Sequence, residues 1–250
     1  MKMAVMAAVL GLSQIGAAWA DHLDQRTAEV RTVLYYHATP EVMAAALPAG
    51  WEAMDVPAGP AKGANLTVNI SDQLLAVTPQ GTAAGDARGQ AVTISARVRN
   101  PKTGENCAMV LFGMTNGVDV PGPYGRHHAA SVTMVKSEHS DASAGVDIEE
   151  VWDAATKEGD RLHVALDFPR GATVLTHVDQ ETHSGERPNF YRIYRMDMVQ
   201  DTVLSRALGV DRTRKLEVTS AGAAARLLDG AELKAVVSVP SYRRDIWLPE

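Results

Sequence analysis

Apolar and polar side chains alternate along Val92-Thr93-Ile94-Ser95-Ala96-Arg97-Val98-Arg99. Successive side chains of a β-strand point to opposite faces, so this period of two predicts a strand with one apolar and one polar face. Comparable short runs, rich in Val, Ile, Thr and Tyr, recur along the chain. They predict strands over residues 30–38, 65–76, 91–99, 107–115, 130–136, 161–168, 172–184, 190–196, 215–219 and 233–239.

The segments between these runs favour antiparallel pairing. Parallel neighbours need a crossover of a dozen residues or more, and few of the connections are that long. Polar or glycine-rich segments predict loops over residues 56–64, 79–90 and 137–145. Pro169-Arg170-Gly171 lies between two runs and predicts a tight hairpin turn.

Helices are expected to be few and short. Thr39 as N-cap and Pro40 at the first helical position predict a helix that ends before Pro48. Apolar residues at roughly helical spacing predict a second over 197–208, and a third is expected over 223–228. The fold class is therefore mainly β (α+β): a large antiparallel curved sheet, or a cone or barrel around a central cavity, with two or three short helices. Such folds often enclose an apolar ligand cavity.

Composition excludes several classes of protein. The 250 residues carry a formal net charge of -6, with 46% hydrophobic and 22% charged residues. These values are typical of globular proteins and exclude a disordered chain, a collagen-like fibre and a basic nucleic-acid binder. The single cysteine, Cys107, excludes an intrachain disulfide. Its apolar neighbours predict a buried, unreactive thiol.

The first twenty residues have the pattern of a secretory signal peptide. Lys2 precedes an apolar run, and Ala18-Trp19-Ala20 forms an A-x-A cleavage site before Asp21. An uncleaved membrane anchor is the alternative, although the apolar run is short for a span. We expect residues 1–20 to be removed and residues 21–250 to form one periplasmic or secreted domain, without a membrane or nucleic-acid partner.

The order of segments resembles the acetoacetate decarboxylase-like superfamily, a cone-shaped antiparallel β fold around a central cavity. The resemblance covers most of the chain after residue 20. It includes the helix at 39–47, the phrase Leu47-Pro48-Ala49-Gly50-Trp51-Glu52 and the segments 65–76, 110–116 and 236–249. The family's decarboxylases form a Schiff base on a lysine that a second lysine activates. Residues 121–128, where the pair would fall, contain no lysine. The resemblance therefore implies this fold without lysine imine chemistry.

The same segment supplies the first candidate site. Arg126 is a candidate to bind a carboxylate with Tyr124, and His127 and His128 are candidate catalytic groups near neutral pH. Adjacent side chains of an extended segment diverge, so only one of the two histidines can face a given cavity. The alternative is a polar loop with solvated histidines.

Residues 190–195 supply the second candidate site. Arg192 and Tyr194 share one strand face and are candidates to bind a carboxylate or an enolate oxygen. The alternative is aromatic packing with solvated arginines. Lys62 and Lys136 are weaker candidates for a catalytic amine. The pairs Glu149-Glu150 and Arg243-Arg244 are expected on solvated faces.

His177, Asp179, Glu181 and His183 share one face of a predicted strand. Imidazole and carboxylate are zinc or iron ligands, but His177 and His183 would lie about 20 Å apart, so all four cannot bind one ion. At most two neighbours could do so, with further ligands from elsewhere. A solvated face is the favoured interpretation, and neither a metal nor a cofactor is predicted.

These observations favour an exported enzyme or binder of a small organic acid or ketone, acting on a small (keto) acid without lysine imine chemistry. The first alternative is a non-catalytic periplasmic carrier of a small apolar ligand, with a cavity lined by Val, Leu and Met. The second is a metal-dependent enzyme that uses the face of residues 177–183. Oligomeric state and substrate identity are left open.

Overall fold

The computed structural model describes residues 21–85, 89–141 and 145–249. The expected signal peptide, residues 1–20, lies outside the described residues. The elements are β1 (His22–His37), α1 (Pro40–Ala46), β2 (Glu52–Ala53), β3 (Leu66–Val77), β4 (Gly89–Arg99), β5 (Asn106–Thr115), β6 (His127–Asp141), β7 (Gly145–Thr156), β8 (Arg161–Pro169), β9 (Thr173–Ser184), β10 (Tyr191–Ser205), β11 (Val210–Asp211), β12 (Lys215–Ala221), α2 (Gly222–Leu228) and β13 (Glu232–Leu248).

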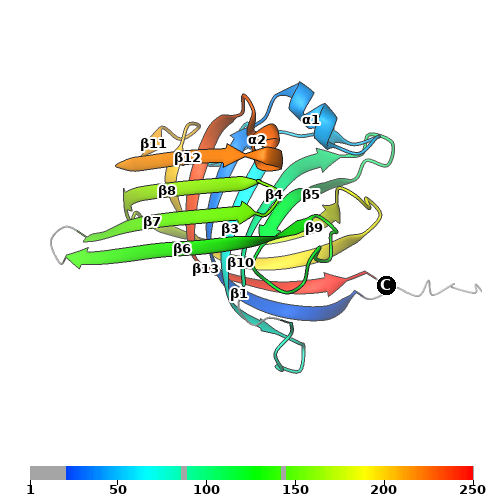
Figure 1. Cartoon of the computed structure of the whole chain (residues 1–250), viewed down its shortest axis with the longest axis horizontal. Coiled ribbons are helices and arrows are strands. Elements are labelled where there is room, and N and C mark those ends of the chain that lie inside the picture. Colours follow the sequence, from blue (N-terminus) through cyan, green and yellow to red (C-terminus); the bar gives the residue numbers. More distant parts are fainter. Residues whose placement is uncertain (1–20, 86–88, 142–144, 250) are drawn as a thin grey trace, which may run out of the picture.

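Seven of these strands close into a ring. The hydrogen-bonded order is β4-β5-β9-β10-β13-β1-β3, and β3 pairs with β4 to complete the circuit. Only β5–β9 is parallel within the ring. The sheet continues from β5 through β6, β7, β8 and β12, which lie as a second layer across the ring strands (Figure 1). The predicted mainly β fold, mostly antiparallel and closed around a cavity, is confirmed.

The period of two along the ring strands separates two environments. On β4, Val92, Ile94, Ala96 and Val98 are buried in the main apolar core, between the ring and the second layer. The alternate residues of the same strand, among them Thr93 and Ser95, face the ring interior. The second layer contributes Trp152, Val164 and Phe168 to the core, and the helices contribute Met43 and Ala224. The ring is thus apolar outside and mixed inside, where polar side chains lie beside a smaller apolar cluster that includes Val33, Val110 and Met196.

Two of the three predicted helices are confirmed. Thr39 caps α1, its Oγ1 accepting from the Val42 N–H at 3.4 Å, and Pro40 opens the helix. The predicted helix over 223–228 corresponds to α2. None of the helices in the described part of the chain combines the length and the hydropathy of a membrane span.

The helix predicted over residues 197–208 is wrong. β10 runs to Ser205 and pairs with β9 on one side and β13 on the other. A register shift between Thr202 and Leu204 allows the adjacent residues Val203 and Leu204 both to be buried. The apolar residues therefore do not alternate here, and their spacing resembles that of a helix. Pairing on both edges outweighs the local apolar pattern.

Two predicted connections also differ from the structure. Residues 169–171 do not form a hairpin, because β8 pairs with β7 and β12 while β9 pairs with β5 and β10. The segment is the crossing from the second layer to the ring. Residues 137–145 include the ends of β6 and β7, a hairpin whose outer part is polar because it is exposed. β7 itself was not predicted.

Candidate functional site

The ring encloses a cavity of about 910 Å³. Inward-facing residues of all seven ring strands line it, together with residues 117–119 and 122–124 and His127 at the start of β6. Because side chains alternate along each strand, one residue of each successive pair reaches the interior. On β3 and β4 these inward residues are mainly polar. Elsewhere they include apolar side chains, and Val33, Val110, Met196, Val239 and Ile246 form a second, smaller apolar cluster on the cavity wall.

A buried carboxylate organises one wall of the cavity. Glu29, on β1, accepts from Arg31 Nε at 2.8 Å, from Arg244 Nη2 at 2.8 Å and from Thr27 Oγ1 at 3.0 Å. Burial opposes ionisation of Glu29, but Arg31 and Arg244 outweigh it and hold the pKa of Glu29 below its ordinary value. The Arg31 guanidinium also lies 3.5 Å from the ring centroid of Tyr242. Two guanidinium groups share one carboxylate, so this wall stays positive.

Two tyrosines lie beside this cluster. The hydroxyls of Tyr124 and Tyr194 are hydrogen-bonded, and the Arg244 guanidinium lies 4.6 Å from the Tyr194 ring centroid. Burial, and next the Tyr194 neighbour, raise the pKa of Tyr124 well above its ordinary value, so this phenol stays protonated. Arg192 lines the same cavity and forms an ion pair with Asp24 at 3.5 Å.

His127 is the first residue of β6 and lies against the neighbouring ring strands. Its Nε2 is 3.1 Å from Thr93 Oγ1, and its Nδ1 is buried without a hydrogen-bond partner. Gly113 is required here because a Cβ at this position would overlap the His127 ring. Burial, with a contribution from His128, lowers the pKa of His127 to about 4. The imidazole is therefore neutral at pH 7.

The structure places four of the six predicted site residues on the cavity: Tyr124, His127, Arg192 and Tyr194. Arg126 and His128 are not among its described lining residues. Arg126 is half-buried, and its backbone carbonyl accepts from Gly113 N at 2.9 Å. His128 is exposed, with its ring 5.2 Å from that of Phe112. As adjacent positions require, only one of the two histidines reaches the interior.

The lysine candidates lie elsewhere. Lys62 is exposed, and Lys136 pairs with Glu138 at 3.3 Å and Glu150 at 3.7 Å. The cavity lining in the described part of the chain includes no lysine.

Sequence reasoning missed several buried charges. Arg244 and Glu150 were expected to be solvated, but Glu150 is buried against Thr32 and Trp152, and Arg244 is bound to Glu29. Glu29 was missed because the predicted strand began at residue 30, whereas β1 begins at His22, and without Glu29 the buried role of Arg31 was missed as well. The alternation over residues 27–31 was the available signal, since it places opposite charges two residues apart on one face.

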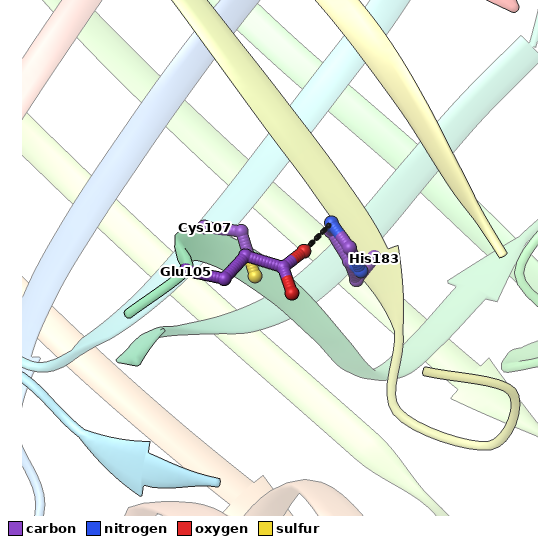
Figure 2. Close-up of side chains that lie close together, drawn as sticks. All are labelled: Glu105, Cys107 and His183. Atoms are coloured by element: carbon purple, nitrogen blue, oxygen red, sulfur yellow. Dashed lines mark ion pairs between the residues drawn. The ribbon is translucent and has the colours of Figure 1, made fainter. Parts of the chain in front are cut away.

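The face of residues 177–183 is divided. His177 is exposed, and its Nδ1 lies 2.9 Å from Asp197 Oδ1, a hydrogen bond that raises the pKa of His177. Asp179 and Glu181 are also exposed. The expectation of solvation is wrong for His183, which is buried. It converges with Glu105 and Cys107, and their ligand atoms all lie within 4.8 Å of one another (Figure 2). These residues are the candidate metal ligands of the described chain.

Comparisons with known proteins identify the fold. No family model and no curated protein match the sequence. Among solved structures, the chain is similar to an acetoacetate decarboxylase-like enzyme from Sphingomonas wittichii RW1, with a TM-score of 0.58 and 12% identity over 98% of this chain and 100% of that one. It is also similar to the enduracididine biosynthesis enzyme MppR complexed with pyruvate, with a TM-score of 0.54 and 11% identity over 97% and 96% of the two chains.

A further structure of MppR, complexed with the condensation product of pyruvate and imidazole 4-carboxaldehyde, gives a TM-score of 0.54 and 11% identity over 97% of this chain and 95% of that one. Identities this low establish the fold alone. The chain has the acetoacetate decarboxylase-like fold, as its segment order predicted.

Proposed function

We propose that this protein binds a small keto acid inside the ring and activates it without a lysine imine. The observation that carries the proposal is a set of buried polar atoms on the cavity wall that have no hydrogen-bond partner within the described chain: Arg192 Nε, Arg244 Nε, Tyr242 OH and His127 Nδ1. Buried polar groups are rarely left unpaired, so these atoms are suited to a polar ligand or to the water that it displaces.

The charge of the wall favours an anionic ligand. The whole lining holds four arginines and four carboxylates, but around Glu29 two guanidinium groups, those of Arg31 and Arg244, share one carboxylate. Guanidinium groups bind carboxylates through paired, charge-assisted hydrogen bonds, so this part of the wall suits an anionic group. The solved relative MppR holds pyruvate, a keto acid that a cavity of about 910 Å³ is large enough to admit. The same fold and a cationic wall support the assignment of this ligand class.

The neutral groups fit the carbonyl end of such a ligand. In the hydrogen-bonded pair Tyr124 and Tyr194, one hydroxyl donates to the other, and the remaining hydroxyl can donate to a carbonyl oxygen and stabilise the charge of an enolate. His127, neutral at pH 7, can accept a proton from the carbon beside that carbonyl. Arginine stays protonated and cannot be the imine nucleophile, so the described lining, which has no lysine, supports enolate chemistry instead.

The test is a calorimetric titration of pyruvate and acetoacetate into the full chain. Arg192→Met should weaken binding about 10- to 100-fold, the effect of one charge-assisted hydrogen-bond donor. Arg195→Met is the matched control, because Arg195 lies on the same strand but stacks on Trp247 at 4.3 Å and is exposed. Equal affinities in the two variants, or no binding of any keto acid, would refute the proposal.

Borohydride treatment tests the imine-free part separately. Reduction traps a lysine imine as a permanent adduct, so the mass of the protein incubated with either keto acid should be unchanged. A stable adduct would show that an amine participates. The apolar-carrier alternative is tested by a titration with octanol, which should show no saturable binding.

Export is part of the same proposal. It is supported by the charged start, short apolar run and A-x-A site of residues 1–20. Sequencing the N-terminus of the protein recovered from the periplasm or medium should give Asp21 as the first residue. Recovery of an uncleaved chain in the membrane fraction would favour the anchor alternative.

A further inference from the structure

We propose that Glu105, Cys107, Glu181 and His183 form a binding site for a divalent transition-metal ion, with Zn²⁺ the best match, and that the ion links β5 to β9. The site lies where these two strands meet in parallel, and Figure 2 shows Glu105, Cys107 and His183 converging there. This metal site does not depend on keto-acid binding.

Strand register brings the four residues together. Met109 lies opposite His183 in the parallel ladder, so Cys107 and Glu105, two and four residues earlier, approach the same face as His183 and Glu181. β9 supplies Glu181 and His183, and β5 supplies Cys107, with Glu105 immediately before its first residue. Residues spaced by two along an extended chain point to the same side. Adjacent strands lie about 4.8 Å apart, close enough for four side chains to reach one point.

The tautomer of His183 directs a lone pair into the site. Nδ1 lies 2.7 Å from the backbone carbonyl of Pro188, which can only accept, so Nδ1 carries the proton. In the neutral ring Nε2 is then an acceptor, and it is buried without a hydrogen-bond partner. A histidine whose outer nitrogen donates to a carbonyl, with its other nitrogen free, has the arrangement found in metal ligands.

The neighbour of that nitrogen is also an acceptor. His183 Nε2 lies 3.1 Å from Glu105 Oε1 and 3.7 Å from Glu181 Oε2. A lone pair facing carboxylates in a buried site needs a positive charge between them, which either a proton or a metal ion can provide. Ligand atoms of a tetrahedral zinc site with bonds of about 2.0–2.2 Å lie roughly 3.5 Å apart, so the two distances bracket the expected value.

Cys107 distinguishes the metal from the proton. Its Sγ lies within 4.8 Å of the ligand atoms of Glu105 and His183. On binding, the S–H bond breaks, the proton passes to solvent, and the thiolate donates its electron pair to the ion. Thiolate and imidazole together select Zn²⁺ over Mg²⁺ or Ca²⁺.

The surroundings hold His183 in place and leave a path for the ion. The His183 ring stacks on Tyr191 with centroids 4.8 Å apart and planes at 8°, and Trp51 packs at 5.7 Å. Glu105 is about one-third exposed, and Cys107 and Glu181 lie on the cavity wall. The site is therefore both positioned by packing and open to solvent on the Glu105 side.

A metal ion bound at this position would stabilise the contact between β5 and β9. The ring closes between β5 and β9 through only three register pairs, whereas β4 and β5 share nine. An ion bound to both strands would strengthen the shortest of these two ladders. Zn²⁺ should consequently raise the unfolding midpoint of the protein, because it binds the folded state preferentially.

The experiment uses Co²⁺ and Zn²⁺ with the full chain after treatment with a chelator. Cys107 is the only cysteine, so a thiolate-to-Co²⁺ charge-transfer band can come from no other residue of this chain. We expect one equivalent of Co²⁺ to produce the band, Zn²⁺ to remove it by displacement, and Zn²⁺ to raise the unfolding midpoint.

Cys107→Ser should abolish the band and weaken Zn²⁺ affinity on the order of 100-fold, because the thiolate is the softest donor of the set. Glu105→Gln, which keeps the thiol and the buried ring, should weaken Zn²⁺ binding while keeping a Co²⁺ band. His177→Asn is the matched control, since His177 lies on the same strand beside exposed carboxylates and should leave both readouts unchanged.

Absence of the band in the wild type, or Zn²⁺ affinity unchanged in Cys107→Ser, would overturn the proposal and leave an imidazolium–carboxylate pair in its place. Loss of binding in His177→Asn instead would assign the ion to the exposed face. If Cys107→Ser unfolds, Glu105→Gln and the wild-type Co²⁺ spectrum still decide the question.

Discussion

The inner and outer faces of the ring strands differ in chemistry, although alternate residues of the same strands form them. On β3, Leu66, Val68 and Ile70 are fully buried outside the ring, whereas Thr67, Asn69 and Ser71 line the cavity inside it. The outer face packs against the second layer and the helices. A small filled barrel would have the opposite arrangement, with aliphatic side chains inside.

The difference separates stability from function on one scaffold. The apolar outer face holds the fold together through burial, and this leaves the inner face free to carry charge. The inner face nevertheless has one structural centre, the carboxylate of Glu29 between Arg31 and Arg244. Substitutions on the two faces should therefore have different signatures, with this centre as the exception.

The largest loss of stability is expected at that centre. Glu29→Gln keeps the shape of the side chain but leaves Arg31 and Arg244 buried without their counter-charge, which should cost about 3–5 kcal/mol in the free energy of unfolding. Urea unfolding at pH 7 measures the loss. Glu52→Gln, which breaks an exposed pair with Arg99, is the control and should cost much less.

The stabilising effect of Glu29 should also depend on pH. Its folded pKa lies below the unfolded value, so the contribution is present above about pH 4.5 and is lost as pH falls through the folded pKa. A loss in Glu29→Gln no greater than that in Glu52→Gln would show that solvent reaches the centre and that the inner face carries no structural charge.

A pair of substitutions on β4 tests the two faces directly. Ile94 is fully buried outside the ring, and Ile94→Ala should cost about 2–5 kcal/mol in the free energy of unfolding. Thr93, the preceding residue, lines the cavity beside His127, and Thr93→Ala should cost about 1 kcal/mol, the value of one hydrogen bond. Equal losses in the two variants would mean that the interior is packed as tightly as the core.

The pH dependence of stability separates the two histidines of β6. The folded pKa of His127 is about 4, below the unfolded value of about 6.5, so the unfolded chain binds more protons between these values. Stability should fall by about 3 kcal/mol as pH decreases from 6.5 to 4 because of this residue. His127→Gln should remove that part of the dependence, as measured by urea unfolding at several pH values.

His128→Asn is the matched control for this effect. His128 is exposed, so the variant should retain nearly the whole pH dependence of the wild type. The reverse result, with the dependence lost in His128→Asn and kept in His127→Gln, would place the wrong histidine in the interior.

The sequence predicts the strands better than it predicts their orientation. The alternation over residues 92–99 correctly separates the two faces of β4, but no local sequence pattern indicates that the apolar face points out of the ring. That direction depends on the second layer, whose strand β7 was not predicted. Residues 197–208 fit a helical spacing equally well, and only pairing of β10 on both edges decides for a strand.

The site residues also divide into those that a local pattern predicts and those that depend on long-range pairing. Arg192 and Tyr194 could be predicted because an aromatic and a cation share one strand face. Arg244 could not be predicted, because Arg243 and Arg244 look alike in sequence. Only Glu29, on a strand that is distant in sequence, identifies Arg244 as the buried one. The convergence of His183 with Cys107 depends on a parallel register between β5 and β9, which no local pattern reveals.

The smallest losses in the free energy of unfolding are expected for the cavity tyrosines. Tyr194→Phe removes the hydroxyl bound to Tyr124 and should cost about 1 kcal/mol in unfolding free energy, since water in the cavity can replace the lost partner. Tyr242→Phe should cost nothing measurable, because the Tyr242 hydroxyl has no hydrogen-bond partner in the described chain. Both variants should weaken keto-acid binding in calorimetry. A hydroxyl that contributes to affinity without contributing to stability is what distinguishes a ligand-facing wall from a packed core, so unchanged affinity in Tyr242→Phe would remove that residue from the site.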